Sequence, residues 1–447
     1  MELTPIDEQS LARLTDAQLN ELVLAHEAVF RGRCRDNITT FAKSVEIPGA
    51  PPALTQEQKV WLADRKTRLD RTIKEVEDEV FDGDEAPLYG SKVDVGLHHE
   101  MILEAIKATV EEVPVFGSMA NGMDGVTPDG VMIFAPPGCA KSTYASVAAP
   151  AYLLGLYQDF DIISASYASE LAKRFGRRVR HMCRSKDFQN IFETELREDN
   201  QAVDQWSLKN NSSYRAVGIM GGITGFRANL FIIDDPVAGR EEADSEIIRE
   251  KTWQAYKDDI TTRLKPGGKI CIIQTRWHQD DLSGRILGPN WDGQSGLWEG
   301  TDGRIWLVLC LPLVAERADD PLGRRAGEIL WHRKDDGTGW FTDRHVELAK
   351  AAGERSWNSL QQQRPTAAKG NIIRRDLWKC WPHGNPEPTA EQMANPHAVK
   401  PPDVLAVFLT YDTAFEDKED NDDSAMCAWG YFEKTINVSH RKDEQVK

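Results

Sequence analysis

The sequence lacks the features that would place it in a membrane, a secreted or a zinc-stabilised class. No apolar run approaches the roughly 18 residues that a membrane-spanning helix needs, and the start, MELTPIDEQS, has no basic flank followed by an apolar core. Its 7 cysteines are scattered, with no CxxC pair and no Cys/His cluster at zinc spacing. We therefore expect a protein of the cytoplasm with reduced, mostly buried thiols.

Positive charge is also scarce. The chain has 54 lysines and arginines against 71 aspartates and glutamates, a net charge of −17. A protein that coats nucleic acid needs many cations to displace phosphate counterions, so the charge argues against that class but not against a local basic face. With 40% hydrophobic and 28% charged residues the composition is that of a globular protein, and 447 residues predict two or three domains.

The patterns that are present divide the chain into four predicted parts. Residues 1–94 are predicted to be a helical region, with helical leucine spacing in LARLTDAQLNELVLAHEAVF and a second helix after a proline pair. Residues 95–311 begin with the helix LHHEMILEAIKATVEEV and then alternate strands with helices. Residues 312–400 are predicted to be a connecting region with short helices. In residues 401–447 a strand, VLAVFLTYD, could pair with SAMCAWGYFE.

Five apolar runs in the second part predict strands: VMIFA, FDIISAS, LFIID, KICIIQT and RIWLVLC. Continuous apolar strands separated by helices are typical of a parallel sheet that is covered on both faces. The predicted fold class is therefore α/β with a mainly parallel sheet.

The segment VMIFAPPGCAKSTYASVAA predicts a strand, a turn and the start of a helix, with Lys141, Ser142 and Thr143 at the junction. A phosphate-binding loop lies at such a junction, because backbone N–H groups face the anion, the lysine reaches the phosphates and the hydroxyl ligates Mg²⁺. Ala135 and Ala140 occupy both usual glycine positions, and we expect alanine to serve only where the backbone avoids positive φ. A plain Pro/Gly turn is the alternative. The residues predicted to contact the nucleotide here are Pro137, Gly138, Cys139, Ala140, Lys141, Ser142 and Thr143.

An acidic motif follows further along the chain. The run LFIIDDP is an apolar strand that ends in Asp234 and Asp235. P-loop ATPases present a magnesium carboxylate in this form, followed by a residue that orients the attacking water. We predict that Asp234 holds the metal and that Asp235 is the catalytic base, with Glu241 and Glu242 as substitutes. Two aspartates in a polar turn after a core strand are the alternative.

A third motif, KICIIQTRWHQDDLSGRIL, places Gln274, Thr275, Arg276 and His278 at the end of a strand. Polar groups at the carboxyl end of a central strand lie beside the nucleotide crevice of an open α/β sheet. We expect them to respond to the γ-phosphate, although His278 could instead pack beneath a helix.

Two further stretches separate these motifs. The run AKRFGRRVRHMCRSK predicts one helix with a basic face, which could contact DNA or a neighbouring subunit or could simply be solvated. The run GIMGGITGFRANL is rich in glycine, as expected of a loop that moves with nucleotide state, and its Arg227 is a further candidate for phosphate contact.

Taken in order, APPGCAKST, SYASELAKRFGRRVR, GGITGFRANLFIIDDP, IIQTRWHQDDLSGRIL, LQQQRP and TYDTAF resemble the successive signatures of the large terminase subunits of tailed bacteriophages. The resemblance covers roughly residues 95–430 and implies a P-loop ATPase of the additional-strand class joined to an RNase H-like nuclease. Thr275 and Arg276 fall in the segment that couples hydrolysis to motion, and Asp412 falls on the first metal carboxylate of the nuclease. The ATPase positions that it matches are Lys141, Ser142, Asp234 and Asp235.

The resemblance also implies ATP and Mg²⁺ as cofactors, and Mg²⁺ or Mn²⁺ for a complete nuclease. The implied partners are double-stranded DNA, a small terminase subunit and the portal protein of the prohead, on which a ring of subunits would work in the host cytoplasm. Such nucleases need several carboxylates around two metal ions, whereas the run EDKEDNDDS after Asp412 is typical of a solvated loop. We therefore expect an incomplete RNase H-like domain.

Two alternatives to this motor stay open. One is a helicase-like or chromatin-remodelling ATPase, which shares the loop and the acidic strand but has a second motor domain that this sequence lacks. The other is a non-catalytic prophage remnant whose role is binding. ATP turnover by the purified protein would separate the remnant from the motor.

Overall fold

The computed structural model describes residues 28–48, 95–221, 225–317, 320–335 and 338–365, together with the backbone of two strands, Ala406–Asp412 and Ala425–Tyr431. The chain divides into two compact units, Met1–Ala368 and Lys369–Lys447, and each is described by itself. The domain limits given above stay predictions. Within the described residues no helix has the length and hydropathy to span a membrane.

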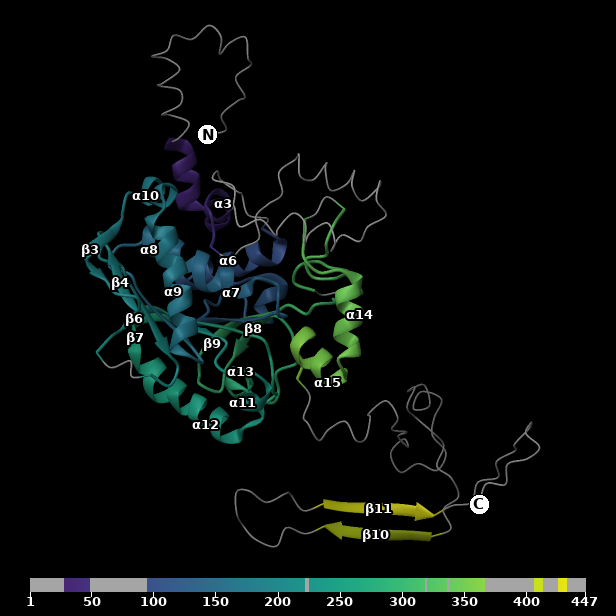
Figure 1. Cartoon of the computed structure of the whole chain (residues 1–447). Helices are drawn as coiled ribbons and strands as arrows, with labels where there is room; N and C mark the ends of the chain where they lie inside the picture. Colours follow the sequence, from purple (N-terminus) through teal and green to yellow (C-terminus); the bar gives the residue numbers. More distant parts are fainter. Residues whose placement is uncertain are drawn as a thin grey trace, which may run out of the picture. The chain divides into compact units, whose positions relative to one another are not determined.

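A nine-stranded sheet forms the centre of the first unit, in the order β3-β4-β5-β2-β6-β7-β1-β9-β8 (Figure 1). The strands from β5 to β9 in this order run parallel, whereas β3, β4 and β8 pair antiparallel at the two edges. The bounds are Gly130–Phe134 (β1), Asp161–Ser166 (β2), Leu196–Gln201 (β3), Gln205–Leu208 (β4), Ser213–Gly218 (β5), Ala228–Asp234 (β6), Leu264–Gln274 (β7), Gly296–Glu299 (β8) and Ile305–Cys310 (β9).

All five predicted strands are confirmed, as β1, β2, β6, β7 and β9. Four further strands, β3, β4, β5 and β8, were not predicted. The edge strand β3, LREDNQ, is too polar for an apolar run, and β8 has only 4 residues. Edge strands carry little periodic signal because they are short and partly solvated.

The order of the central strands places β7 between the loop strand β1 and the acidic strand β6. An inserted strand at this position defines the additional-strand class, so this part of the fold prediction is confirmed. The register aligns Phe134 with Gln274 and Asp234 with Ile273. The loop after β1 and the ends of β6 and β7 therefore meet at one edge of the sheet.

Helices cover both faces of the sheet, as the continuous apolar strands predict (Figure 1). Along β1, Val131 and Ile133 pack in one buried cluster with helices Leu97–Val110 (α6), Ala149–Leu156 (α8) and Ser169–Arg184 (α9). Met132 and Phe134 pack in the other cluster, with Ala255–Ile260 (η3) and Leu282–Leu287 (α13). Alternate residues of a strand point to opposite faces, which divides the core in this way.

The helical segments complete the unit and include short 3₁₀ and π turns. Their bounds are Ile38–Ser44 (α3), Leu97–Val110 (α6), Gly117–Ala120 (η1), Lys141–Thr143 (α7), Tyr144–Ala148 (η2), Ala149–Leu156 (α8), Ser169–Arg184 (α9), Lys186–Phe192 (α10), Arg240–Asp244 (α11), Glu246–Gln254 (α12), Ala255–Ile260 (η3), Thr261–Arg263 (η4), Leu282–Leu287 (α13), Asp343–Ala351 (α14), Glu354–Ser356 (α15) and Trp357–Gln361 (η5).

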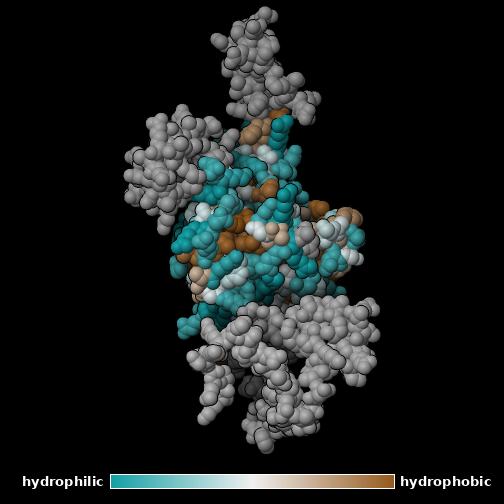
Figure 2. All heavy atoms as spheres, turned by 90° about the vertical axis from the view of Figure 1, so that its right-hand side faces the viewer, coloured by the Kyte–Doolittle hydropathy of each residue, from teal (hydrophilic) through white to brown (hydrophobic). Residues whose placement is uncertain are grey.

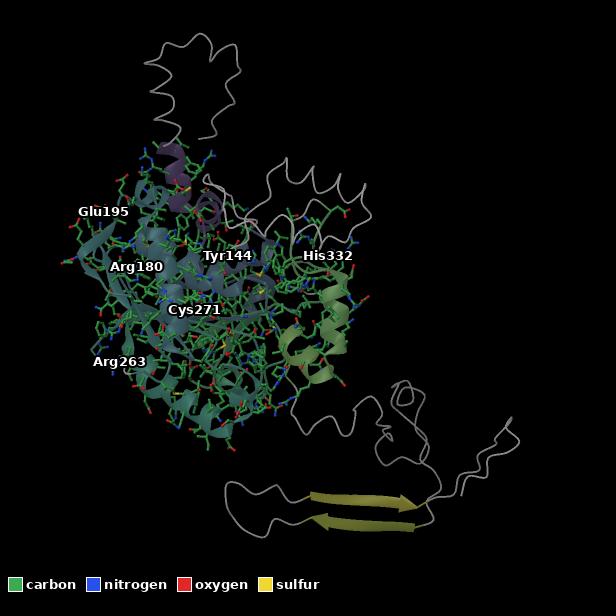
Figure 3. All side chains as sticks on the ribbon, in the orientation of Figure 1. Tyr144, Arg180, Glu195, Arg263, Cys271 and His332 are labelled. Carbon is green, nitrogen blue, oxygen red and sulfur yellow. The ribbon has the colours of Figure 1, made fainter. Side chains whose placement is uncertain are left out.

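The predicted helix LHHEMILEAIKATVEEV is confirmed as α6, and the basic run forms α9, although that helix ends at Arg184 and Lys186 begins α10. The predicted helices of residues 11–30 and 53–81 lie outside the described residues except for 28–30, which are helical. The five cysteines in the described part are free and buried, as expected; one of them, Cys271, lies in the sheet (Figure 3).

The segment that follows β9 belongs to the first unit and packs on its sheet. The N–H of Leu311 donates to the carbonyl of Phe134 in β1, and Gln362 donates its side-chain amide to the carbonyl of Val314 at 3.0 Å. Two glutamines of the LQQQRP motif, Gln362 and Gln363, are buried. Buried amides need hydrogen-bond partners, so this motif holds the segment in place.

The second unit contains the predicted pair of strands. β10, Ala406–Asp412, and β11, Ala425–Tyr431, are antiparallel, with Asp412 opposite Ala425. The predicted pairing of VLAVFLTYD with SAMCAWGYFE is confirmed. The acidic run EDKEDNDDS lies between the strands and outside the described residues.

Candidate functional site

The loop between β1 and α7 has the backbone of an anion-binding turn. Gly138 has φ 86° and Ala140 has φ 59°, so two residues adopt the left-handed conformation. The prediction that alanine avoids positive φ here is therefore wrong at Ala140. The left-handed conformation costs an alanine about 1–2 kcal/mol, and the packing of the neighbouring loop and helix must offset that cost.

The helix after the loop contains one π turn, and its sequence explains why. Pro150 lies in the first turn of α8 and has no N–H to donate to the preceding turn, so the regular α ladder is interrupted over Tyr144–Ala148. Within this turn, the hydroxyl of Ser146 donates to Asp234 at 2.5 Å. The π turn thus connects the loop helix to the end of β6.

The side chains of the loop and of the acidic strand meet directly. Ser142 Oγ donates to Asp234 Oδ1 at 2.9 Å, and Lys141 Nζ donates to Thr275 Oγ1 at 2.8 Å. Thr275 Oγ1 in turn donates to the carbonyl of Ala135 at 3.2 Å. The structure therefore brings together three of the predicted elements: the loop, the carboxylate of β6 and the threonine after β7.

Asp235 lies beside this group in a strained conformation. Its φ is 45°, and its Oδ1 accepts from the N–H of Thr275 at 3.2 Å. Its own N–H donates to the carbonyl of Ile273 at 2.8 Å. Asp235 therefore adopts the left-handed conformation although it is not glycine, and its hydrogen bonds to Ile273 and Thr275 hold it there. These surroundings set the direction of its side chain.

The site contains two buried side chains of opposite charge, Lys141 and Asp234. Burial and the neighbouring Asp235 carboxylate raise the pKa of Asp234 to about 7, while its hydrogen bonds and Lys141 act in the opposite direction. Burial alone would lower the pKa of Lys141, but Asp235, Cys139 and Asp234 together raise it above its ordinary value. Lys141 therefore stays charged, whereas Asp234 binds a proton more readily than an ordinary aspartate.

Residues 132–336 match the family model described as "Terminase large subunit, T4likevirus-type, N-terminal". The matched region is therefore similar to the N-terminal part of large terminase subunits. It includes the loop, the acidic strand and the segment after β7. A comparison with curated proteins found no match.

Three solved structures resemble this chain, each at low sequence identity. The large terminase of bacteriophage HK97 is 15% identical with TM-score 0.31, over 44% of this chain and 37% of that one. The ATPase domain of the Thermus phage P74-26 large terminase is 15% identical with TM-score 0.26, over 40% and 72%. The large terminase of a thermophilic bacteriophage is 9% identical with TM-score 0.26, over 40% of each chain. The similarity thus spans only about a third of the HK97 protein's length, and these identities are too low to transfer the role of any residue.

A pair of buried histidines, which no motif in the sequence indicated, supports the loop between β1 and α7. The Nε2 atoms of His98 and His99 lie 3.1 and 2.8 Å from the carbonyl oxygen of Cys139. His99 Nδ1 accepts from the N–H of Gly96 at 3.0 Å, so its Nε2 carries the proton and donates to the carbonyl. Burial lowers the pKa of His98 to about 4 and that of His99 well below its ordinary value. Two neutral imidazoles of α6 therefore hold the Cys139 carbonyl of the loop.

Arg276, predicted to lie in the segment that couples hydrolysis to motion, forms a buried ion pair with Asp281. Its guanidinium is buried and its Nε donates to Asp281 Oδ2 at 2.6 Å, between the rings of Phe134 and Trp291 at 5.1 and 5.3 Å. Its N–H donates to Gln363 Oε1 at 3.1 Å. Arg276 therefore ties the end of β7 to α13 and to the segment after β9, and its catalytic role stays a prediction.

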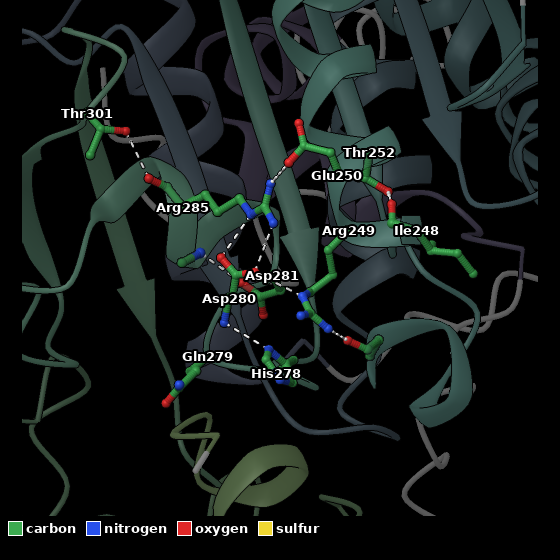
Figure 4. Close-up of polar contacts among 12 residues, drawn as sticks. Ile248, Arg249, Glu250, Thr252, His278, Gln279, Asp280, Asp281, Arg285 and Thr301 are labelled. Atoms are coloured by element: carbon green, nitrogen blue, oxygen red, sulfur yellow. Dashed lines mark hydrogen bonds and ion pairs between the residues drawn. The ribbon is translucent and has the colours of Figure 1, made fainter. Parts of the chain in front are cut away.

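A charge network fixes the rest of this third motif. Asp280 accepts from Arg249 of α12 and from Arg285 of α13, and Arg285 also pairs with Glu250 (Figure 4). His278 Nδ1 accepts from the N–H of Asp280 at 3.0 Å. His278 therefore shapes the turn before α13 and makes no described contact with the loop.

Other predicted residues lie apart from the Lys141–Asp234 group. Glu241 is exposed on α11, without a hydrogen bond or ion pair to any described residue, while Glu242 accepts from the N–H of Ala238 at 2.7 Å. Arg227 precedes β6, at the opposite end of that strand from Asp234, and donates to the carbonyl of Leu264 at 3.4 Å. Asp412 ends β10 in the second unit, where only the backbone is described.

The oxygens near Lys141 fit a magnesium ion better than a softer metal. No group of three or more His, Cys, Asp or Glu residues in the described ranges could hold a metal by protein ligands alone. Mg²⁺ is usually bound by one or two protein oxygens together with substrate phosphates and water. Ser142 Oγ and Asp234 Oδ1, 2.9 Å apart, provide such a pair at the mouth of the loop.

Proposed function

We propose that this chain binds ATP with Mg²⁺ at residues 135–143, hydrolyses it, and uses the energy to move double-stranded viral DNA into a prohead. The observation that carries the proposal is the hydrogen bond between Ser142 of the loop and Asp234 of the acidic strand, beside the buried Lys141. This is the arrangement of a P-loop ATPase, and it occurs within a large terminase family region. The large terminase of the thermophilic bacteriophage has been determined in complex with ADP, but the proposal rests on the loop of this chain.

Each residue of the site has a proposed role. Lys141 neutralises the terminal phosphates, and its bond to Thr275 holds it ready. Ser142 and Asp234 hold Mg²⁺, which supplies charge neutralisation for the phosphate oxygens. Asp235 orients the attacking water and accepts its proton, because its carboxylate lies at the same edge and is held by the N–H of Thr275.

We also propose the partners that the family implies. Duplex DNA, the small terminase subunit and the portal protein are the expected contacts, with several copies of this chain working as a ring on the portal in the host cytoplasm. Asp412, which ends β10, is the residue that we propose as the first metal carboxylate of an incomplete nuclease domain. These statements extend beyond the matched residues 132–336.

The Lys141→Ala variant tests the ATP site. Removing the ammonium group should lower kcat for ATP hydrolysis by on the order of 10²-fold or more, because it removes charge stabilisation in a buried site. The measurement is phosphate release by the full chain with Mg²⁺ and DNA. The control is Lys251→Ala on α12, whose side chain is exposed and which should keep the parent rate. Unchanged hydrolysis by Lys141→Ala would contradict the assignment of the site.

A further inference from the structure

A cavity of about 280 Å³ lies next to the phosphate loop and has an aromatic wall. The loop and the first turn of its helix form one side, and two tryptophans of the segment after β9 form the other. The lining residues are Gly138, Ala140, Lys141, Ser142, Thr143, Trp331 and Trp340. The proposed ATP site uses only the polar part of this cavity, so the two indoles have no assigned role.

Trp331 is fixed in place by its neighbours. Its ring lies 5.4 Å from the ring of His98 and 4.6 Å, edge-on, from that of His99. A side chain added at Gly96 would meet the Trp331 indole at 3.0 Å, so the approach is close. Trp331 also has φ 50°, a conformation that a bulky residue rarely adopts. The indole is thus a rigid wall, held by the same histidines that support the loop.

Trp340 is anchored through its backbone but leaves its ring exposed. Its N–H donates to the carbonyl of Trp331 at 2.9 Å, and the next residue, Phe341, is buried. The residue as a whole is 45% exposed, and its Nε1 lies 3.3 Å from the position of a Cβ on Gly138. Within the described residues its ring stacks on no other aromatic ring.

The side of the molecule that carries α14 has a mixed surface (Figure 2). On the side of the molecule that carries α14, Figure 2 shows hydrophobic area enclosed by hydrophilic area. Figure 3 marks His332, the neighbour of Trp331, on that side, and Tyr144 in the helix after the loop. An exposed indole beside a phosphate cradle is apolar area that a planar ligand could cover.

We propose that Trp340 is the platform on which the base of the bound nucleotide stacks, with Trp331 as the wall behind it. This inference rests on the proposed ATP site. The terminal phosphates lie at the end of the loop marked by Lys141 and Asp234, so the sugar and the base extend outward from the loop to the side that the indoles close. Stacking on an indole depends on the π-face of the base and not on its hydrogen-bonding edge, so the platform accepts either purine.

The experiment compares two ligands that share a phosphate chain. The affinities of ATP and of inorganic tripolyphosphate are measured by calorimetry with Mg²⁺ on the full chain. Trp340→Ala should weaken ATP binding by roughly 5- to 100-fold and leave tripolyphosphate binding unchanged, because only ATP has a base to stack. Trp340→Phe should retain most of the ATP affinity. Phe116→Ala, which alters another exposed aromatic residue, is the control and should change neither affinity.

The possible outcomes separate this inference from the proposed function. Unchanged ATP affinity in Trp340→Ala, or an equal loss for both ligands, would overturn the platform and leave the ATP site standing. Equal affinity of the parent for ATP and tripolyphosphate would also overturn it. If the parent bound neither ligand, the proposed function would fall and the platform with it.

Discussion

At the scale of single residues, the site depends on two backbone conformations that L-residues rarely adopt. Ala140 and Asp235 have φ 59° and 45°, and they stand at the start of the loop helix and just after β6. The backbone conformation of these two residues sets the direction of their N–H groups and side chains. Beside them, Lys141 reaches Thr275 and Asp234 accepts from Ser142. Strain of this kind is typical of functional sites.

Ala140→Gly should make the protein more stable. Glycine adopts positive φ without the clash of a Cβ, so we expect the free energy of unfolding to rise by on the order of 0.5–1 kcal/mol. The matched control is Ala168→Gly, another alanine N-cap, which has φ −124° and no such strain. Chemical denaturation of both variants gives the comparison. A gain no larger than that of Ala168→Gly would show that the left-handed assignment at Ala140 is wrong.

At the scale of elements, α6 acts on the loop through its first turn. His98 and His99 both donate to the Cys139 carbonyl, and Trp331 packs against both rings. The loop is therefore backed by a helix that precedes β1 and by a segment that follows β9. Both imidazoles must be neutral, since burial lowers their pKa.

This support predicts a pH dependence of stability. The pKa of His98 is about 4 when folded and 6.5 ordinarily, so the neutral ring stabilises the fold above pH 6.5, and this stability is lost as the pH falls from 6.5 toward 4. By pH 5 the loss should be on the order of 2 kcal/mol. His98→Gln, which keeps an N–H donor, should show a correspondingly shallower slope of unfolding free energy between pH 6.5 and 5.

Comparing the parent with His98→Gln separates the contribution of His98 to the pH dependence from that of other titrating groups. Asp234 has a raised pKa and contributes a slope of opposite sign in the same range, but it does so in parent and variant alike. His181→Gln, an exposed histidine on α9, should leave the slope of the parent unchanged. Equal slopes in the parent and His98→Gln would contradict the buried neutral state of His98.

At the scale of the whole molecule, the acidic chain concentrates positive charge on one helix. α9 buries its apolar side chains, such as Phe175 and Val179, and exposes Arg174, Arg177 and Arg184. Burial, and to a smaller extent the neighbouring Arg174, lowers the pKa of Arg178. Because the net charge of −17 disfavours DNA binding over most of the surface, we propose that this face is where the chain contacts DNA.

Reversing two of these charges tests the basic face. The double variant Arg174→Glu and Arg177→Glu should weaken binding to duplex DNA and make the salt dependence of the affinity shallower by about one unit per lost phosphate contact. Its ATP hydrolysis without DNA should stay at the parent level. Arg344→Glu on α14, also exposed, is the control. An unchanged salt dependence would mean that the face is merely solvated.

Local patterns in the sequence were enough to predict the central elements of the fold. Five strands, α6 and α9 followed from local apolar runs and periodicity, and the meeting of the loop with Asp234 followed from motifs at strand ends. These features are local, because burial on both faces of a strand and the turn at its end leave their signature within a few residues.

Only the tertiary structure decided which distant groups complete the site. His98 and His99 hold the Cys139 carbonyl, and Trp340 closes the cavity beside the loop. Both contacts exist because the segment before β1 and the segment after β9 meet over one edge of the sheet. The left-handed backbone of Ala140 and the pairing of Arg276 with Asp281 were also decided there. Contacts between distant segments and backbone strain are set by the packing of the whole unit, and no local pattern of residues encodes them.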